Sequence, residues 1–492
     1  MDITIITFIG VMALMILSGA SSIIRKKRTP RDYLIASRQV KPWLAALSTV
    51  ATNNSGFMFI GMIAYTYRLG IESIWMMIGW ISGDLLAWLF VHPKVRHASH
   101  RQSCNTIPAL IGQPVSGEPD QQKRLLIMTT GIITFLFLGI YAAGQLKAGS
   151  TALHTLFGWN MEVGVLIGTG IVLLYSYAGG IRADIWTDAA QSLVMIVSMG
   201  LIMVAGYMEI GGLPALLANL ESQDASLVRL FPDELQFGAL AFVMGFVFAG
   251  FGVIGQPHLM TRLLAIESVA AIKRARVYYF LWFIPFFLAS IGVGLYCRAI
   301  IPDLASMPLA QDLVEPTELA LPMITKELLP EFFIGLSLAG LFAATVSTAD
   351  SQIIVCSGAV TQDINPRWNQ SYLASKLATF AVTSLALIIA LYAPEGVFAL
   401  VLIAWSALGA SLGPILILRI FNRPLSSARA TVMMVVAIIV VIAWHVSGLD
   451  DDVFKLMPGM LSAFIVYQFF PQTLLNKLPG EQRYQAHLQA SR

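Results

Sequence analysis

Long apolar segments, separated by short polar connections, run along most of the chain. A helix that crosses the roughly 30 Å hydrocarbon core of a bilayer needs about 20 apolar residues. Thirteen segments reach about this length: 3–24, 41–66, 71–92, 125–157, 161–179, 185–208, 237–260, 278–300, 331–360, 372–393, 396–420, 428–446 and 453–470. The pattern predicts an all-α protein with thirteen transmembrane helices in a lipid bilayer.

Composition agrees with this pattern and narrows the class of protein. Of the 492 residues, 57% are hydrophobic and 12% are charged, and the mean hydropathy is +0.73, values outside the range of a soluble domain. The net charge of +3 predicts no nucleic-acid partner. Cys104, Cys297 and Cys356 lack CxxC spacing, so we expect neither a disulfide framework nor a zinc site.

The basic residues predict the orientation in the membrane. The first segment has no basic residue before it and "RKKR" (25–28) directly after it, the reverse of a secretory signal peptide. Because Lys and Arg stay on the cytoplasmic side, we expect an outer N-terminus and a cytoplasmic tail in a bacterial inner membrane. The outer connections then hold only five basic residues: Arg68, Arg229, Arg298, Lys326 and Lys455. Two amphipathic outer connections, 209–236 and 302–328, predict short helices.

Two segments contain residues that break helices. "ATNNSGF" (51–57) lies in the middle of the second segment, and "FAGFGVIGQPH" (248–258) lies in the seventh. They open two groups of five segments, 41–208 and 237–420, as in inverted-repeat transporters, where half-helices leave carbonyls free to bind an ion. The alternative is that the glycines form two helix-packing faces.

The repeats predict a single transport domain over residues 1–492. It would consist of an extra N-terminal span at 3–24, the two repeats, two further spans within 428–470 and a tail at 471–492. We expect no soluble module in this tail, which has only 22 residues.

The motifs in the chain do not predict an enzyme. The letters "GFGVIG" (250–255) match the dinucleotide fingerprint GxGxxG, but that fingerprint requires a strand and a helix of a soluble βαβ unit. The sequence contains no GxxxxGK[ST], no HExxH and no nucleophile elbow. We therefore expect neither ATP hydrolysis nor a bound cofactor.

A polar run within the ninth segment, "AATVSTADSQ" (343–352), predicts a cation site. Four small residues share one helical face at the spacing i, i+3, i+4, i+7: Ala344, Ser347, Thr348 and Ser351. Hydroxyl and carbonyl oxygens suit an alkali cation. Alternatively, the hydroxyls bond back to carbonyls one turn earlier. Opposite the first break, where the carbonyls of Ala51 and Asn54 would be unpaired, the cation site is the better interpretation.

Ionisable residues inside apolar segments are further candidates, because an aspartate there costs about 2.5 to 3.5 kcal/mol and usually carries function. They are Asp84, Lys147, Asp188 and Asp350. For Asp188 the alternative is a structural pair with Arg182. Lys147 lies near enough to the outer end to reach the interface, and Asp84 either pairs with Lys147 or binds solute.

The chain resembles the sodium:solute symporter family, in particular its proline-carrying members. Four stretches carry the resemblance: "SGFMFIG" (55–61), "YAGGIRADIWTDAAQS" (177–192), "GQPHLMTR" (255–262) and "STADSQIIVCSGAVTQD" (347–363). The resemblance implies the LeuT-type fold of two inverted five-helix repeats, alternating access, and symport of a small polar solute driven by sodium ions. It implies no cofactor and no obligate protein partner.

The resemblance also implies ligands for the coupling ion. The principal sodium site corresponds to carbonyls and hydroxyls of Ala51, Asn54, Ala344, Ser347 and Thr348. A second cation site, found in some members, corresponds to Asp188, Ser347 and Ser351. Asp350 stands where the proline-carrying members have serine, so this site would hold two carboxylates. Two close carboxylates can bind a second sodium or share a proton, which leaves protons as an alternative coupling ion.

The expected solute pocket departs further from the family. We expect contacts from Asn53, Ser55, Gly56, Phe57, Tyr141, Ala249 and Phe251. Tyr141 matches a tyrosine linked to proline binding, whereas Asn53 replaces an aspartate and both Phe57 and Ala249 replace tryptophans. Proline or another amino acid is the favoured solute, and a short carboxylate or pantothenate is the alternative. A transporter-like membrane sensor and an ion channel are alternatives from other classes.

Overall fold

The structure, a computed structural model, describes residues 2–21, 32, 35–113, 123–178, 180–368 and 371–469. The basic run at 25–28 and the tail at 471–492 lie outside the described residues. Within the described residues the regular structure is helical, apart from an isolated bridge between Val40 and Ile266.

The helices follow the predicted apolar segments. The first half of the chain contains α1 (Ile3–Ser21), α3 (Pro42–Gly56), α4 (Ile63–Leu69), α5 (Ile74–Leu86), α6 (His92–Arg101), α7 (Ile107–Ile111), α8 (Lys123–Phe157), α9 (Met161–Ala178) and α10 (Gly180–Ile210). The second half contains α11 (Leu213–Gln223), α12 (Gly238–Phe251), α13 (Pro257–Ala265), α14 (Val269–Ile300), α15 (Ala320–Leu328), α16 (Glu331–Gly358), α17 (Tyr372–Tyr392), α18 (Val397–Ile420), α19 (Ser427–Val446) and α20 (Leu456–Phe469). The short helices α11 and α15 confirm the prediction for the two amphipathic connections.

Nine helical runs among the described residues are long and apolar enough to cross a membrane. One of them, Pro42–Arg101, contains both the second and the third predicted segment. Three shorter apolar helices, Ile3–Met15, Met161–Leu173 and Leu456–Phe469, coincide with the first, fifth and last predicted segments.

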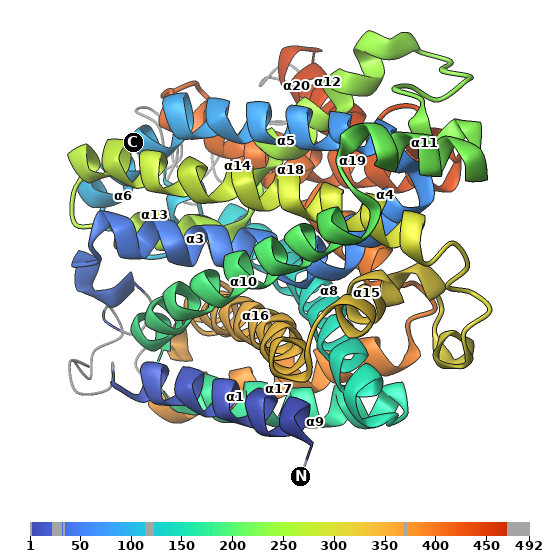
Figure 1. Ribbon diagram of the computed structural model, residues 1–492. Helices are drawn as coiled ribbons and strands as arrows, with labels where there is room; N and C mark the ends of the chain where they lie inside the picture. Colours follow the sequence, from blue (N-terminus) through green and yellow to red (C-terminus); the bar gives the residue numbers. More distant parts are fainter. Residues whose placement is uncertain are drawn as a thin grey trace, which may run out of the picture.

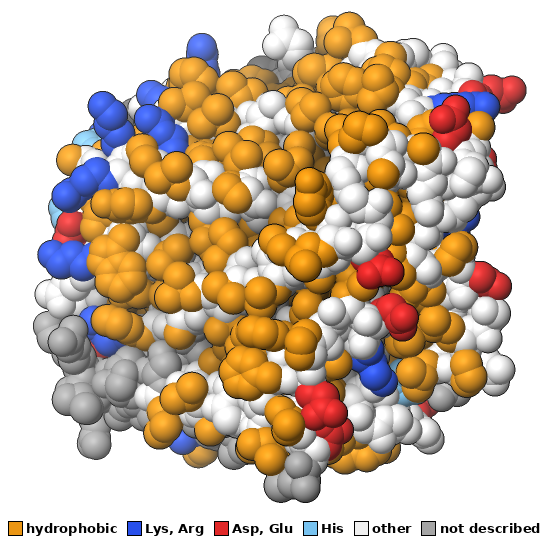
Figure 2. All heavy atoms as spheres, in the orientation of Figure 1, with side chains coloured by type: hydrophobic (Ala, Val, Ile, Leu, Met, Phe, Trp, Pro, Cys, Tyr) orange, Lys and Arg blue, Asp and Glu red, His pale blue; other side chains and the backbone are white. Residues whose placement is uncertain are grey.

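Charged side chains gather at two opposite edges of the molecule. Figure 2 shows apolar side chains across the middle of this face, Lys and Arg mainly at the left edge, and Asp and Glu mainly at the right. The long helices run between these edges. Helix α6 and the first residues of α14 lie at the left edge (Figure 1). We call the left edge the basic edge; its helix ends carry Lys94, Arg101, Lys273, Arg274 and Arg276.

Helix α16 lies in the middle of the bundle. It packs against α1, α3, α8 and α10, and Figure 1 shows it nearly end-on between them. On the other side of α3, helices α5 and α12 approach so closely that only glycine fits at their contact. A Cβ atom on Gly83 would lie 1.9 Å from the carbonyl oxygen of Val247, and one on Gly250 would lie 1.9 Å from that of Trp80. This contact fixes α5 beside α12, the first part of the second broken helix.

Candidate functional site

The first predicted break is centred on Ser55. This residue has φ 42° and ψ −161°, outside the helical region and unusual for a residue other than glycine. A π-helical turn, Phe57–Met62, follows before α4 begins. The N–H of Gly56 donates to the Gln145 Oε1 atom of α8 at 3.0 Å. A Cβ atom on Gly56 would lie 2.7 Å from both Ala148 and Thr345, so the break is in close contact with α8 and α16.

The second predicted break lies between α12 and α13. A 3₁₀ turn, Gly252–Gly255, is followed by Gln256 in an extended conformation, and α13 begins at Pro257. Two side chains tie this break to α18. The Gln256 amide donates to the carbonyl of Trp405 at 2.9 Å, and the Trp405 indole N–H donates to the carbonyl of Ala249 at 2.8 Å.

The residues predicted for the principal sodium site come from two packed helices. All are buried: Ala51 and Asn54 on α3, and Ala344, Ser347 and Thr348 on α16. One detail of the prediction is wrong, because the Asn54 carbonyl accepts the N–H of Phe57. A carbonyl oxygen has two lone pairs, so it keeps one acceptor site for an ion.

The residues predicted for the second cation site lie in a buried cluster of carboxylates. Asp188 accepts hydrogen bonds from Ser48 at 2.5 Å, from Thr52 at 3.2 Å and from Ser347. Ser351 donates to Asp184, at 2.7 and 2.9 Å from its two oxygens. Asp184 therefore belongs to the same cluster as the predicted residues, although the sequence did not predict it for this site.

A buried arginine completes this cluster. The Arg262 side chain is 0% exposed and forms ion pairs with Asp184 at 2.7 Å and Asp188 at 2.9 Å. Its Nε donates to Ser48 at 2.9 Å, so one guanidinium connects α13 to α3 and α10. Asp350 is buried and interacts electrostatically with both Asp184 and Arg262.

The alternative partner predicted for Asp188 was wrong. Arg182 forms an ion pair with Asp32 at 2.6 Å, while Asp188 pairs with Arg262. A signal for the observed arrangement exists in the sequence. Asp184 and Asp188 are spaced i, i+4 and therefore share a face of α10, whereas Arg182 is on another face.

The residues predicted to contact solute divide between two places. Ser55, Gly56 and Tyr141 lie together, because the buried Tyr141 hydroxyl interacts with the Ser55 side chain. The Tyr141 ring packs edge-on against His258 at 5.4 Å. In contrast, the Asn53 amide donates to the hydroxyl of Tyr279 on α14 at 2.6 Å, away from Tyr141.

The other three predicted contacts have apolar surroundings. Ala249 is fully buried beneath Trp405. The backbone nitrogen of Phe251 lies close to Gly83 of α5. Phe57 belongs to an aromatic stack that continues through neighbouring helices. The centre of its ring lies 5.5 Å from that of Phe398 and 5.6 Å from that of Trp80. The stack continues from Phe398 to Tyr65, with 5.2 Å between ring centres, and from Trp80 to Trp405, with 5.1 Å.

Sequence reasoning missed two glutamines at the breaks. The Gln145 Nε2 and the Gln256 Oε1 are buried without a hydrogen-bond partner among the described residues. Buried polar atoms normally have partners, so these two atoms remain available for a hydrogen bond to water or to a polar solute. The signal was available, since both are polar residues inside apolar segments.

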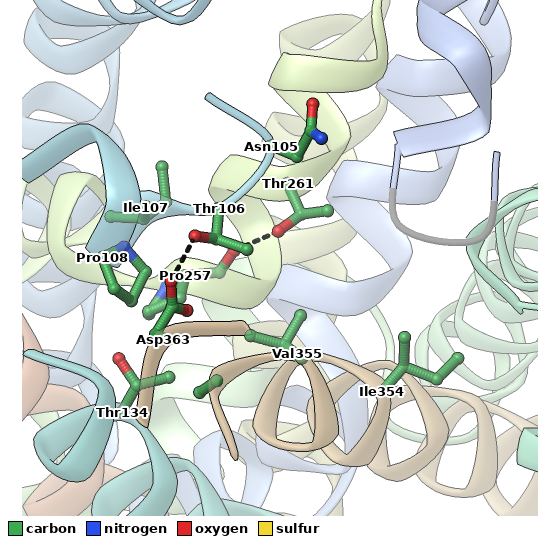
Figure 3. Close-up of a pocket in the computed structure, with 12 residues that line it drawn as sticks. Asn105, Thr106, Ile107, Pro108, Thr134, Pro257, Thr261, Ile354, Val355 and Asp363 are labelled. Carbon is green, nitrogen blue, oxygen red and sulfur yellow. Dashed lines mark hydrogen bonds between the residues drawn. The ribbon is translucent and has the colours of Figure 1, made fainter. Parts of the chain in front are cut away.

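A narrow cavity lies between the second break and the basic edge. It is a small space of about 20 Å³ between α7, α8, α13 and the end of α16. Figure 3 shows Thr106 and Asp363 pointing toward each other across it, and the Thr106 hydroxyl donates to Asp363 at 2.9 Å. Arg124 donates to the Asp363 carbonyl at 2.6 Å and holds the same turn. Polar contacts between α7 and the end of α16 therefore cross this cavity.

Lys147 and Glu318 lie in the same region near the opposite edge and interact electrostatically. Lys147 donates to the carbonyls of Ala393 and Glu395, both at 2.7 Å, as expected for a lysine that reaches the interface. Glu318 lies in the connection between α14 and α16, is 4% exposed, and accepts the N–H of Phe398 at the start of α18 at 3.3 Å. Burial raises the pKa of Glu318 to about 7, although the N–H groups of Phe398 and Val397 and the charge of Lys147 lower it.

Glu318 should make the stability of the protein depend on pH. Its pKa is about 7 in the folded state against an ordinary value of 4.5, so the folded state binds more protons between these values. Stability therefore decreases as the pH rises from about 4.5 to about 7, by at most about 3 kcal/mol. We expect Glu318→Gln to remove this part of the pH dependence of thermal unfolding in detergent. The exposed Glu327→Gln is the control; the same pH dependence in Glu318→Gln and wild type would contradict the assignment.

Two interrupted helices around buried oxygen atoms are typical of secondary transporters. The chain belongs to the sodium:solute symporter family, whose model matches residues 33–437. It is similar to the high-affinity proline transporter of Bacillus subtilis (strain 168), with 28% identity over 470 residues that cover 92% of this chain and 95% of that protein. It is also similar to the sodium/proline symporter of Escherichia coli (strain K12), with 27% identity over 457 residues and coverage of 91% and 88%.

Solved transporters share the fold. One is a Na⁺-coupled sialic acid symporter in a substrate-bound outward-open state, with a TM-score of 0.73, 20% identity, and coverage of 95% of this chain and 97% of that chain. Another is Mhp1, a nucleobase-cation-symport-1 family transporter, in a closed conformation, with a TM-score of 0.56, 15% identity and coverage of 92% and 97%. The chain is thus a multi-pass membrane symporter whose relatives are transporters and not enzymes.

Proposed function

We propose that the protein imports proline, or a closely related amino acid, together with sodium across the cytoplasmic membrane by alternating access. One observation carries this proposal: the hydroxyl face of α16 packs against the break in α3, inside a fold shared with sodium-coupled transporters. The substrate follows from the proline-carrying relatives and from Tyr141, which lies beside Ser55 at the break.

The chain would cross the membrane thirteen times. In this proposal 41–208 and 237–420 are inverted five-helix repeats, 3–24 is an extra span before them, and 428–470 holds two spans after them. The breaks at equivalent places in the two repeats support this division. The basic edge would face the cytoplasm and the N-terminus would lie outside, as the separation of charges in Figure 2 supports.

Sodium would bind between the first break and α16. Its ligands would be the carbonyls of Ala51, Asn54 and Ala344 and the hydroxyls of Ser347 and Thr348. Carbonyl and hydroxyl oxygens suit an alkali cation, and the five residues are buried on packed helices. A bound ion would hold α3 and α16 together and thereby couple sodium binding to the position of the break.

The carboxylate cluster would hold a second cation. Asp184, Asp188 and Asp350 together with Arg262 carry two negative charges in excess when all four are ionised. Close carboxylates repel one another, so a sodium ion or a proton stabilises such a group. The hydroxyls of Ser347 and Ser351 already point at these carboxylates.

We expect Asp350→Ser to remove the second cation and to leave the principal sodium site intact. If the second cation is sodium, the Hill coefficient for sodium should decrease from about 2 to about 1 and the pH dependence of uptake should stay. If it is a proton, the pH dependence of uptake should decrease and the Hill coefficient for sodium should stay unchanged. Uptake rates measured against sodium and pH in proteoliposomes separate these results. Equal loss of the sodium dependence and the pH dependence of uptake, or a change in neither, would count against the second site.

The substrate is tested by uptake into proteoliposomes under an inward sodium gradient. Proline, other amino acids, short carboxylates and pantothenate would be compared as labelled solutes. We expect proline or a close amino acid to accumulate, and accumulation to stop when sodium is replaced by potassium. Accumulation of a carboxylate alone would replace the proposed substrate, and accumulation of no solute under a sodium gradient would overturn the symporter proposal.

A further inference from the structure

Asp84 is a buried carboxyl group that the proposed sodium and solute sites do not use. It lies on α5 next to the tight contact of Gly83 with α12 and is 0% exposed. Its Oδ2 accepts the hydroxyl of Tyr279 at 2.6 Å, and its Oδ1 has no hydrogen-bond partner among the described residues. Lys147, the partner considered from the sequence, binds carbonyls elsewhere, so that pairing was wrong.

A chain of hydrogen bonds connects Asp84 to the first break. The Tyr279 hydroxyl has one hydrogen and donates it to Asp84, so it accepts from the Asn53 amide at 2.6 Å. This direction turns the Asn53 Oδ1 away from Tyr279, and that oxygen is buried without a partner among the described residues. Asn53 lies only two positions before Ser55. The charge on Asp84 therefore acts on a side chain at the break.

A second line of polar groups runs from Asp84 toward the basic edge. Trp88 and His92 follow Asp84 on the same helical run, in and directly after a π-helical turn, Ala87–Val91. The Trp88 ring lies 5.0 Å from Tyr279 and 4.8 Å from His92. The indole nitrogen and both imidazole nitrogens are buried without partners among the described residues. Buried polar atoms of this kind are normally satisfied by ordered water.

From these contacts we infer that Asp84 is a proton-binding site that exchanges its proton with the basic edge by way of His92 and ordered water beside Trp88. The carboxylate binds one proton that arrives from the aqueous phase as hydronium, which leaves a water molecule, and it becomes neutral; no electron is transferred. A neutral carboxyl group can donate a hydrogen bond to the Tyr279 hydroxyl. The hydrogen bonds between Asp84, Tyr279 and Asn53 then run in the opposite direction, and the Asn53 amide is released. The inference rests on the proposed function, because the reversal acts on the break that would hold sodium and solute.

The surroundings of Asp84 contain few other groups that titrate. Tyr279 faces it from α14, and His92 lies on its own helical run. Helix α12 and the turn Gly252–Gly255, which pack against α5, contain no charged or titratable residue. Glu72, in the turn before α5, is about three helical turns away. A change in the protonation of Asp84 can therefore be measured with little interference from its neighbours.

Infrared spectroscopy of the purified protein tests the proton site without any transported solute. A neutral carboxyl group has its own carbonyl band, and we expect one such band to titrate with pH in wild type and to be missing in Asp84→Asn. The exposed Asp224→Asn is the control and should keep the band. If Asp84→Asn does not fold, Tyr279→Phe should move the midpoint of the same titration. An identical titrating band in wild type and Asp84→Asn, or an unmoved midpoint in Tyr279→Phe, would overturn the inference.

Uptake at different internal pH values tests the effect on transport. Under a fixed sodium gradient, the wild-type rate should change by up to about tenfold per pH unit on one limb of the profile. Asp84→Asn should keep sodium-driven uptake and lose this dependence. Sodium-driven uptake with an unchanged pH profile in Asp84→Asn would overturn the inference alone. Absence of sodium-driven uptake in wild type would overturn the proposed function, and the infrared titration would still decide about Asp84.

Discussion

Replacing Arg262 by glutamine is expected to abolish sodium-driven uptake and to lower the thermal stability of the protein. The guanidinium is fully buried and pairs with Asp184 and Asp188. Removing one partner of a buried ion pair typically costs about 3 to 5 kcal/mol, because the remaining charge stays buried without compensation. The same side chain connects α13 to α3, so its loss also removes a hydrogen bond between the second broken helix and the first. Uptake in proteoliposomes and thermal unfolding in detergent measure the two effects.

Two further variants show whether the ion pair is the cause. Asp184→Asn combined with Arg262→Gln removes one charge of each sign and should recover part of the stability lost in Arg262→Gln alone. Arg274→Gln is the matched control, because Arg274 is an exposed arginine that pairs with Glu267 at 3.5 Å. We expect it to have little effect. Wild-type uptake and stability in Arg262→Gln would contradict the cluster as described.

Replacing Thr348 by alanine is expected to raise the sodium concentration for half-maximal uptake by about 10- to 100-fold. The change removes one proposed oxygen ligand, and a polar contact to a charged group contributes about 1.5 to 3 kcal/mol. The maximal rate at saturating sodium should change much less, since the other proposed ligands and the two breaks remain. Initial rates of uptake over a range of sodium concentrations measure this shift.

A threonine in the π-helical turn that follows α16, Ala359–Ile364, provides the control. Thr361 is buried and its hydroxyl donates to the carbonyl of Ser357 at 2.8 Å, one turn earlier. This is the arrangement that Thr348 would have if its hydroxyl served only its own helix. Thr361→Ala should leave the sodium dependence unchanged. If Thr348→Ala behaves in the same way, Thr348 is not a sodium ligand.

The helices and both breaks could be predicted because their signals are local. Apolar length marks the helices, and Gly, Pro, Asn and Ser inside apolar segments mark the breaks at Ser55 and at Gly252–Gly255. These residues act on their own backbone, so no knowledge of distant contacts was needed. Within the candidate site, the placement of Ser347 and Thr348 on one buried face followed from helical periodicity alone.

The partners of the buried charges could not be predicted, because they are distant in the sequence. Arg262 is 74 residues from Asp188, and Tyr279 is 195 residues from Asp84. The sequence offered Arg182 as the alternative partner of Asp188 because the two are only six residues apart, and Arg262 was not among the candidates. The fold places Arg182 against Asp32 instead. Only tertiary packing decides between such partners.

The energy available from sodium is sufficient for the proposed transport. One sodium ion that enters through a potential of about 150 mV gains roughly 3.5 kcal/mol, at about 2.3 kcal/mol per charge per 100 mV. A tenfold sodium gradient adds about 1.4 kcal/mol. The sum, near 5 kcal/mol, supports accumulation of a solute by a few thousandfold.

Simultaneous measurement of labelled sodium and labelled proline entering the same proteoliposomes tests the central claim most directly. The account predicts that each flux increases when the other solute is present, in a fixed ratio, and that Thr348→Ala weakens both together at low sodium. Proline entry that proceeds at the same rate without any sodium flux would contradict it.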